Sequence, residues 1–329
     1  MSASRRDFAP VLLALRAAGL GDLLTAIPAW RGLARAFPGY RRIIATPAAL
    51  APIVTMLNAE HCEHAGLARL VCARPTVAVN LHGKGPQSHE TLLATEPQAL
   101  VAYAHPDVPA SALGPVWDDE EHEVVRWCRL LGAFDIHTDA QELGLTATAE
   151  QLATADAIVG DVDDDNTTVI HPGAGSGARR WPIARYAAVA RVERDAGRRV
   201  LVTGTTEERR RAARVAAGGR VPSRDVVAGR TDLNALIGIV AGAGRVICGD
   251  TGVAHLATAL GTPSVVLFGP TRPARWGPPP SRAHIALWAG RNGNPHGRRV
   301  DPGLLEISVR DVVQALAQLP RRVVHASAS

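Results

Sequence analysis

Long hydrophobic runs are missing from this 329-residue chain. No stretch of about 18 uncharged apolar residues occurs, so a membrane-spanning helix is not expected. The apolar run Val11–Leu15 follows Arg5 and Arg6 but is strand-sized, which is too short for the apolar region of a signal peptide. These absences favour a cytoplasmic protein with at most peripheral membrane contact.

The chain also has few cysteines and few aromatic residues. The four cysteines (Cys62, Cys72, Cys128 and Cys248) show no metal-ligand spacing and are typical of free thiols in a reducing compartment. Aromatic residues make up 4% of the chain and the arginines are spread over many segments, so nucleic-acid binding is not expected. The histidines at 61, 64, 82 and 89 lack ligand pairs at metal spacing, and no metal site is predicted.

Charge is distributed unevenly along the chain. Residues 1–166 hold 12 basic and 21 acidic residues, a net charge of −9, whereas residues 167–329 hold 24 and 10, a net charge of +14. Lys84 is the only lysine, and the composition bias that replaces lysine by arginine does not explain a difference in sign. The second part is therefore expected to attract an anionic ligand and the first part to repel one.

Strand-like apolar runs alternate with longer helical patterns, which is typical of parallel α/β architecture. Strands are expected at 11–16, 42–45, 77–81, 199–203, 245–248 and 264–268, and helices at 22–37, 121–131, 207–217 and 253–260. The polar, acidic stretch 161–168 is predicted to be a linker. It would join two doubly wound domains, 1–160 and 169–308, followed by a helix and tail over 309–329. The linker contains DxD patterns, which metal-dependent sugar transferases also have, but no apolar strand residues flank them.

Gly19-Leu20-Gly21-Asp22 lies between the first strand and its helix, where open α/β sheets bind ligands. A dinucleotide fingerprint would need a third glycine where Leu24 stands, so a dehydrogenase is not indicated. Asp22 fits two roles, a first-turn acid that stabilises the helix or a carboxylate of the site.

Three later strand-to-helix turns have residues suited to an anion or a nucleoside. His171-Pro-Gly-Ala-Gly-Ser-Gly-Ala-Arg-Arg-Trp-Pro182 offers glycine amides together with Arg179 and Arg180, unless it is simply a flexible surface loop. Gly249-Asp-Thr-Gly-Val-Ala-His255 offers Thr251 and helix amides, with His255 one turn further on the same side. Glu207, after Gly204-Thr205-Thr206, is either a ribose ligand or a first-turn acid.

Together these segments resemble glycosyltransferase family 9, the ADP-heptose:lipopolysaccharide heptosyltransferase family. The resemblance runs along nearly the whole chain and rests on several blocks in the same order. They are Gly19 to Asp22, His171 to Pro182, Val202-Thr-Gly204, Ala228-Gly-Arg-Thr-Asp-Leu233, and Gly249 to Ala257, the last continuing into Leu260-Gly-Thr-Pro-Ser-Val-Val-Leu-Phe-Gly-Pro-Thr271.

The resemblance implies a GT-B fold, in which two Rossmann-like, doubly wound domains face a central cleft. The N-terminal domain would bind the acceptor and the C-terminal domain the nucleotide sugar. The implied reaction is an inverting, metal-independent transfer of a heptose or related sugar, with an ADP-sugar as co-substrate and no other cofactor. The last helix, near 309–319, would cross back to the first domain.

The resemblance also implies roles for single residues. Asp22 is the expected general base, the segment from Asp250 to His255 holds the diphosphate, and Arg230 and Thr231 lie near the base of the nucleotide. With the residues inferred above, the expected diphosphate site is Gly173, Ala174, Ser176, Arg179, Asp250, Thr251, Gly252, Val253 and His255. The expected nucleoside site is Thr205, Glu207, Arg230 and Thr231, and the expected acceptor site is Gly21, Lys84, Gln87 and Ser88.

Two departures from the family pattern concern the donor site. Arg179 stands where the family commonly has lysine, and its planar guanidinium binds a diphosphate with a different geometry. Gly252-Val-Ala-His255 stands where Gly-Pro-Met-His is frequent, which leaves the phosphate turn intact but changes the packing beneath it.

Two other functions fit the same loops. A GT-B nucleotide-sugar epimerase would need no acceptor, and a non-catalytic nucleotide-sugar-binding protein would release no product. For a transferase, the acceptor would be a glycan, glycolipid or small molecule. The net charge of −9 predicts that this acceptor is neutral or cationic.

Overall fold

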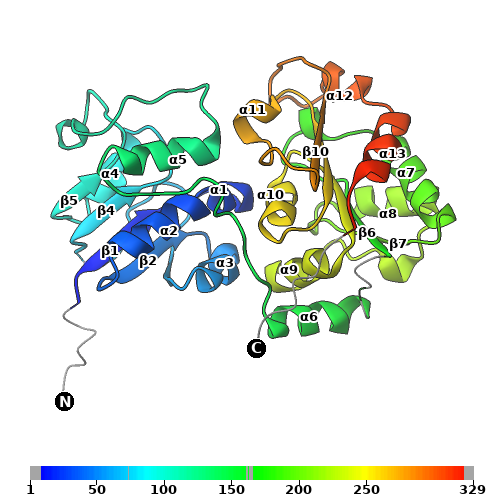
Figure 1. The fold of residues 1–329 in the computed structure, drawn as a ribbon, viewed down its shortest axis with the longest axis horizontal. Coiled ribbons are helices and arrows are strands. Elements are labelled where there is room, and N and C mark those ends of the chain that lie inside the picture. Colours follow the sequence, from blue (N-terminus) through cyan, green and yellow to red (C-terminus); the bar gives the residue numbers. More distant parts are fainter. Residues whose placement is uncertain (1–8, 73, 161, 163–165, 322–329) are drawn as a thin grey trace. The chain divides into compact units, whose positions relative to one another are not determined.

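The computed structural model describes residues 9–72, 74–160, 162 and 166–321. The chain forms two compact units, Met1–Leu143 and Gly144–Ser329 (Figure 1). Both are α/β units with a parallel sheet, as the alternating sequence pattern predicts. None of the helices in the described ranges is both long and apolar enough to cross a membrane.

The first unit is built on a five-stranded sheet with the order β3-β2-β1-β4-β5, and all neighbouring strands are parallel. Its strands are β1 (Val11–Leu15), β2 (Arg41–Thr46), β3 (Glu60–Glu63), β4 (Val77–Asn80) and β5 (Ala99–Val101). The chain passes from β1 outward to β3 and then returns to β4 on the other side of β1. The strand order therefore reverses between β1 and β4, which is where open α/β sheets bind ligands.

The helices of the first unit are α1 (Leu20–Thr25), α2 (Ile27–Ala36), α3 (Ala51–Met56), α4 (Gln87–Leu93) and α5 (Glu123–Gly132). The single helix expected over 22–37 is in fact two, because Pro28 has no N–H to donate to the carbonyl of Leu24. Pro28 is tolerated in the first turn of α2, where such donors have no helical partner.

The second unit has a parallel sheet of order β10-β9-β8-β6-β7. Its strands are β6 (Thr167–His171), β7 (Arg199–Val202), β8 (Arg245–Gly249), β9 (Ser264–Phe268) and β10 (His284–Trp288). Its helices are α6 (Ala149–Val159), α7 (Ile183–Asp195), α8 (Arg209–Gly219), α9 (Leu233–Gly242), α10 (Gly252–Ala259), α11 (Pro273–Trp276), α12 (Pro302–Glu306) and α13 (Val309–Gln318). Here the strand order reverses between β6 and β8.

The boundary between the units falls after Leu143 and not at the acidic stretch. Helix α6 packs on α9 of the second unit, and Gln151 at its first turn donates to Asn234 at 3.1 Å. Thr167 and Thr168, expected in the linker, are fully buried in β6. Of the remaining linker prediction, residues 161 and 163–165 lie outside the described residues.

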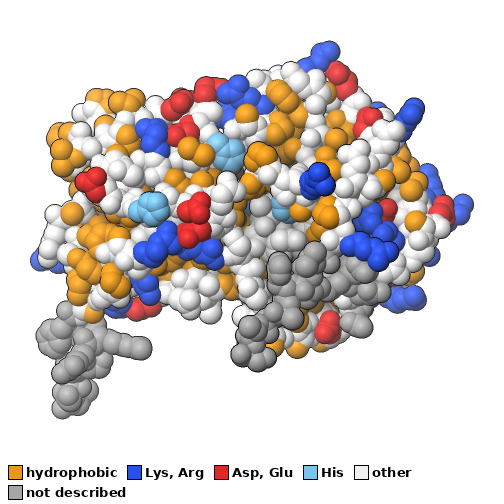
Figure 2. All heavy atoms as spheres, viewed as in Figure 1, with side chains coloured by type: hydrophobic (Ala, Val, Ile, Leu, Met, Phe, Trp, Pro, Cys, Tyr) orange, Lys and Arg blue, Asp and Glu red, His pale blue; other side chains and the backbone are white. Residues whose placement is uncertain are grey.

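This boundary changes the charge balance. Six acidic residues of 144–166 belong to the second unit, so the first unit holds 12 basic and 15 acidic residues and has a net charge of −3. The second unit holds 24 and 16, a net charge of +8. The difference in sign persists but is much smaller, and the visible face of the first unit carries both acidic and basic side chains (Figure 2).

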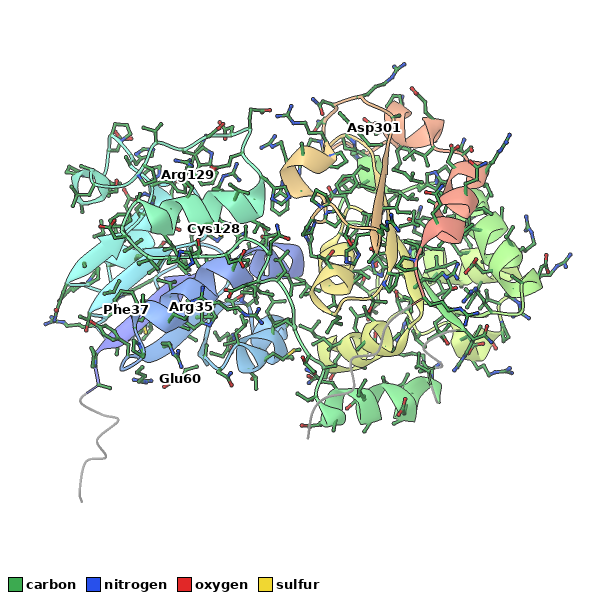
Figure 3. The ribbon with its side chains drawn as sticks, viewed as in Figure 1. Arg35, Phe37, Glu60, Cys128, Arg129 and Asp301 are labelled. Carbon is green, nitrogen blue, oxygen red and sulfur yellow. The ribbon has the colours of Figure 1, made fainter. Side chains whose placement is uncertain are left out.

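The last helix belongs to the core of the second unit. Helix α13 packs on α7 and β9 of its own unit. Its buried residues Val312, Ala315 and Leu316 join the hydrophobic core of the second unit. Asp301 begins the preceding helix α12 by accepting a hydrogen bond from the Gly303 amide at 2.9 Å (Figure 3).

Candidate functional site

Three loops of the second unit meet at the carboxyl edge of its sheet. They follow β6, β7 and β8, which are neighbours in the sheet with β6 in the middle. Parallel strands all end at the same edge, so the residues expected to bind the donor lie along it.

The β8–α10 turn carries Asp250 and Thr251. Asp250 is buried, and Thr251 begins α10 in an extended conformation with no side-chain bond to the helix amides. The first amides of α10, including those of Gly252 and Val253, are thus not used by a capping side chain, and the helix dipole favours an anion there. His255 lies one turn further, with its ring centroid 5.9 Å from that of Trp276.

Arg179 lies beside this turn. Its Nη1 donates to the Asp250 carbonyl at 3.2 Å and is 3.9 Å from the Asp250 carboxylate, and about a quarter of its side chain remains exposed. Arg180, adjacent in sequence, instead donates to the Ala174 carbonyl at 2.9 Å and braces its own loop. The two arginines therefore differ in their contacts: Arg179 lies against the β8–α10 turn, whereas Arg180 contacts its own loop.

The loop from Pro172 to Trp181 is held at several points and is not a flexible surface loop. Arg211 donates to the carbonyls of both Pro172 (2.7 Å) and Trp181, which closes its two ends. Ser176 donates its hydroxyl proton to the Pro295 carbonyl at 2.5 Å. A side chain at Gly177 would lie 1.9 Å from the Arg298 carbonyl oxygen, so only glycine fits there.

At the end of β7 the structure puts Glu208, and not Glu207, at the edge of the sheet. Glu207 is fully exposed, and hydrogen bonding to Thr205 lowers its pKa. The Glu208 carboxylate accepts a hydrogen bond from the Thr205 amide at 2.9 Å and lies 3.8 Å from His171 Nε2. Burial lowers the pKa of His171, with Glu208 opposing the shift, so this imidazole is neutral at pH 7.

Glu208 also occupies the space above Gly173. A Cβ at Gly173 would be 2.0 Å from Glu208 Oε1, so a carboxylate stands where the sequence predicted a phosphate contact. Gly204 and Gly229 join this part of the edge, because the Gly229 amide donates to the Gly204 carbonyl at 2.8 Å. Thr205 is thereby brought near Arg230 and Thr231. Arg230 is exposed and donates to the Arg224 carbonyl at 3.3 Å.

In the first unit, Asp22 follows β1 and lies in the first turn of α1. Its Oδ2 accepts a hydrogen bond from the Gly19 amide at 3.0 Å, and 35% of its side chain is exposed. Asp22 therefore stabilises the start of the helix and still presents a carboxylate at the carboxyl edge of the sheet, next to Gly21.

A network of buried charged residues contacts Asp22, and the sequence patterns did not predict it. Arg16 is 1% exposed; its Nε donates to the Asp22 carbonyl at 2.8 Å and its Nη2 to Glu123 Oε1 at 2.8 Å. Arg126 pairs with the other oxygen of Glu123, and Trp127 donates to Glu123 at 3.0 Å. An arginine directly after a wholly apolar strand was the available signal.

The β4–α4 loop, expected to touch the acceptor, is organised by Asn80. Its side chain donates to Ser88 Oγ at 2.8 Å and accepts from the His82 amide at 2.9 Å. Ser88 is buried and thus supports the loop, whereas Lys84 lies at the surface 3.7 Å from Asp119 and Gln87 is exposed. Within the described residues, no group of three or more His, Cys, Asp or Glu side chains is placed to hold a metal ion.

The family model of Glycosyltransferase family 9 (heptosyltransferase) matches residues 115–302, which is more than half of the chain. The chain belongs to this glycosyltransferase family. The match spans all five strands of the second unit and the three loops at its carboxyl edge.

Among curated family 9 relatives, lipooligosaccharide heptosyltransferase 2 of Haemophilus ducreyi is 31% identical over 142 residues. The matched segment covers 41% of this chain and 38% of that protein, well under half of the relative's length.

Two solved structures show the same fold over nearly the whole chain. The glycosyl transferase family 9 protein from Veillonella parvula has a TM-score of 0.79 at 17% identity, covering 94% of this chain and 96% of that one. The E. coli ADP-heptose lipopolysaccharide heptosyltransferase II has a TM-score of 0.73 at 18% identity, covering 93% and 97%. The two units of this family 9 protein are the Rossmann-like units of the GT-B fold.

Proposed function

We propose that this protein transfers a heptose or a related sugar from an ADP-sugar to a hydroxyl group of a glycan acceptor. The observation that carries the proposal is the β8–α10 turn, where Arg179 lies beside the helix amides that follow Thr251. Family membership and the names of the relatives support sugar transfer with ADP-heptose as donor.

On the donor side, the charged residues at the carboxyl edge of the second sheet indicate where the diphosphate and the ribose bind. The diphosphate binds at the α10 amides and Arg179, which stabilise the negative charge that develops on the leaving group without a metal ion. The ribose binds near Glu208, because a carboxylate accepts hydrogen bonds from hydroxyl groups and repels a phosphate. We therefore place Gly173 on the nucleoside side and assign to Glu208 the role predicted for Glu207.

On the acceptor side, Asp22 is the proposed general base. It removes the proton of the attacking hydroxyl as the bond to the anomeric carbon forms and the bond to the diphosphate breaks, which inverts the configuration at that carbon. With the first unit at a net charge of −3, the argument for a neutral or cationic acceptor loses most of its force. The names of the relatives favour a lipopolysaccharide or lipooligosaccharide as the acceptor.

A thermal-shift series with ADP, GDP, UDP and dTDP tests the donor assignment. A ligand that binds only the folded protein stabilises it by about 2.7 kcal/mol at a concentration of 100 times its Kd. We expect ADP to raise the Tm most. Incubation with ADP-heptose then separates the reactions: release of ADP only with an acceptor indicates transfer, and a new ADP-sugar without acceptor indicates epimerisation. Equal shifts with all four nucleotides, or none, would reject the proposal.

A further inference from the structure

The loop that carries Asp22 has a neighbour at the point where the strand order of the first sheet reverses. Asp22 follows β1, and His82 follows β4, the strand paired with β1 on the other side of this point. Open α/β sheets bind their ligands outside the carboxyl ends of two such strands. His82 therefore stands, with Asp22, where the first unit is best suited to hold a ligand.

Hydrogen bonds inside the unit join the two loops. The Arg16 guanidinium donates to the Leu81 carbonyl at 2.5 Å and to the Asp22 carbonyl at 2.8 Å. The Asn80 side chain accepts from the His82 amide at 2.9 Å. The backbone positions of His82 and Asp22 are thus fixed relative to one another by groups that are themselves buried.

The His82 imidazole has an unused hydrogen-bonding atom. Its Nδ1 is buried and has no hydrogen-bond partner among the described residues, an unusual state for a buried polar atom. The residue as a whole is partly exposed, so a rotation of the ring can bring a nitrogen atom to a ligand. Burial lowers the pKa of His82, and nearby Arg16 and His64 lower it further while Asp22 opposes them. A neutral imidazole offers one donor and one acceptor, which matches the hydrogen bonds of a sugar hydroxyl.

Two other histidines of the first unit, His89 and His64, differ from His82 in burial and hydrogen bonding. His89, in α4, is fully buried, with Nδ1 bonded to Asn80 and Nε2 to the Tyr103 carbonyl, both at 2.7 Å. Its bonding capacity is filled, so its role is structural. His64, at the end of β3, is buried and also has an unpartnered Nε2. It contributes to the electrostatic surroundings of His82.

We propose that His82 is an acceptor-binding residue, whose imidazole forms a hydrogen bond with a hydroxyl of the acceptor sugar beside the hydroxyl that Asp22 deprotonates. The inference rests on the proposed function, because it assumes that the first unit binds the acceptor. It adds a specificity-determining contact to a loop for which Lys84, Gln87 and Ser88 were the expected ligands.

The test uses the full-length protein with ADP-heptose as donor and de-acylated lipopolysaccharide core as acceptor, with methyl glycosides of neutral hexoses as a second acceptor set. In the His82→Ala variant we expect kcat/KM for the acceptor to fall about tenfold, the loss of one hydrogen bond. The KM for ADP-heptose and the affinity for ADP should stay within about twofold. His82→Gln, which keeps donor and acceptor atoms, should recover most of the loss. His137→Ala, at an exposed histidine of the same unit, is the control.

An unchanged acceptor kcat/KM in His82→Ala would overturn the inference, and so would an equal loss of ADP affinity. If the wild-type protein transfers to none of these acceptors, the proposed function fails, and His82 is then examined by NMR with labelled histidine. Signals assigned through His82→Gln should shift on addition of the core glycan or the methyl glycosides, while those of His137 stay unchanged. The absence of a shift at His82 would reject acceptor binding independently of catalysis.

Discussion

The guanidinium of Arg16 holds Asp22 from behind, donating to its backbone carbonyl at 2.8 Å and lying 3.7 Å from its carboxylate. Arg16 is almost fully buried, while about a third of the Asp22 side chain is exposed. The proposed base is therefore fixed through its backbone, and its carboxylate stays accessible to a ligand.

Replacing Asp22 by Asn should abolish most of the transfer reaction. The amide is nearly the same size and can still accept the hydrogen bond from the Gly19 amide, so the start of α1 should remain intact. It cannot take up the proton of the acceptor hydroxyl, and general-base catalysis contributes about 10²- to 10⁴-fold. The kcat for acceptor-dependent ADP release should fall within that range.

The control for Asp22→Asn is the affinity for ADP, measured by calorimetry, which should not change because the donor residues belong to the other unit. A variant that binds ADP normally and keeps most of its transfer rate would show that Asp22 is only a helix-stabilising acid.

Replacing Glu123 by Gln should destabilise the first unit. The change removes the carboxylate that pairs with the buried guanidinium groups of both Arg16 and Arg126, and breaking a buried ion pair in this way typically costs about 3–5 kcal/mol. The free energy of unfolding in urea measures the loss. Glu60→Gln is the matched control, since Glu60 pairs with Arg41 at the surface (Figure 3) and such pairs contribute about 0–1 kcal/mol.

The unfolding free energies of the wild type and of Glu123→Gln should also depend differently on pH. Burial acts to raise the pKa of Glu123, but Arg16 and Arg126 outweigh it, and the net pKa is lowered. A lowered folded-state pKa stabilises the protein above the unfolded value of about 4.3, and this stabilisation is lost as the pH falls through the folded pKa. The wild-type unfolding free energy should fall in that acidic range, and Glu123→Gln should show a smaller fall. Equal pH profiles would contradict the assignment.

The sequence predicted the parts of this fold that depend on local pattern. The strand-to-helix turns at Asp22, Gly173 and Thr251 follow from apolar runs that end in glycine and polar residues, and the structure places all three at carboxyl edges. Their grouping on two separate sheets agrees with the two doubly wound domains that the sequence predicts, whereas the strand order within each sheet is not specified by alternation alone.

Other features depend on contacts between distant segments. Arg16 and Glu123 meet across 107 positions, and neither has a local signal of pairing. Helix α6 belongs to the second unit only because its buried face fits α9, so an acidic stretch was a poor indicator of the boundary. The sequence pattern predicts a helix start at Glu207, but α8 begins at Arg209 and Glu208 is the residue directly before it. The choice between the two glutamates therefore depends on the exact helix start, which a sequence pattern does not specify to within one or two residues.

Replacing Arg179 by Ala should weaken ADP binding. A hydrogen bond to a charged partner contributes about 1.5–3 kcal/mol, equivalent to roughly a 10- to 150-fold change in Kd. Arg179→Lys should recover part of this loss, because it restores the charge but not the planar geometry. Adenosine, which lacks phosphate, should bind both variants as it binds the wild type. A loss of adenosine affinity equal to that of ADP would indicate a collapsed loop and not a phosphate contact.

Two adjacent glutamates give the sharpest test of the nucleoside site. Glu208 lies at the edge between β6 and β7, with 12% of its side chain exposed, whereas Glu207 points to solvent. Glu208→Gln should raise the Kd for ADP about tenfold, since an amide accepts hydroxyl hydrogen bonds more weakly than a carboxylate. Glu207→Gln should leave it unchanged. ADP with both ribose hydroxyls replaced by hydrogen should bind wild type and Glu208→Gln equally, because the contact in question is then absent from both. A larger effect at Glu207 than at Glu208 would return the ribose role to the residue that the sequence predicted.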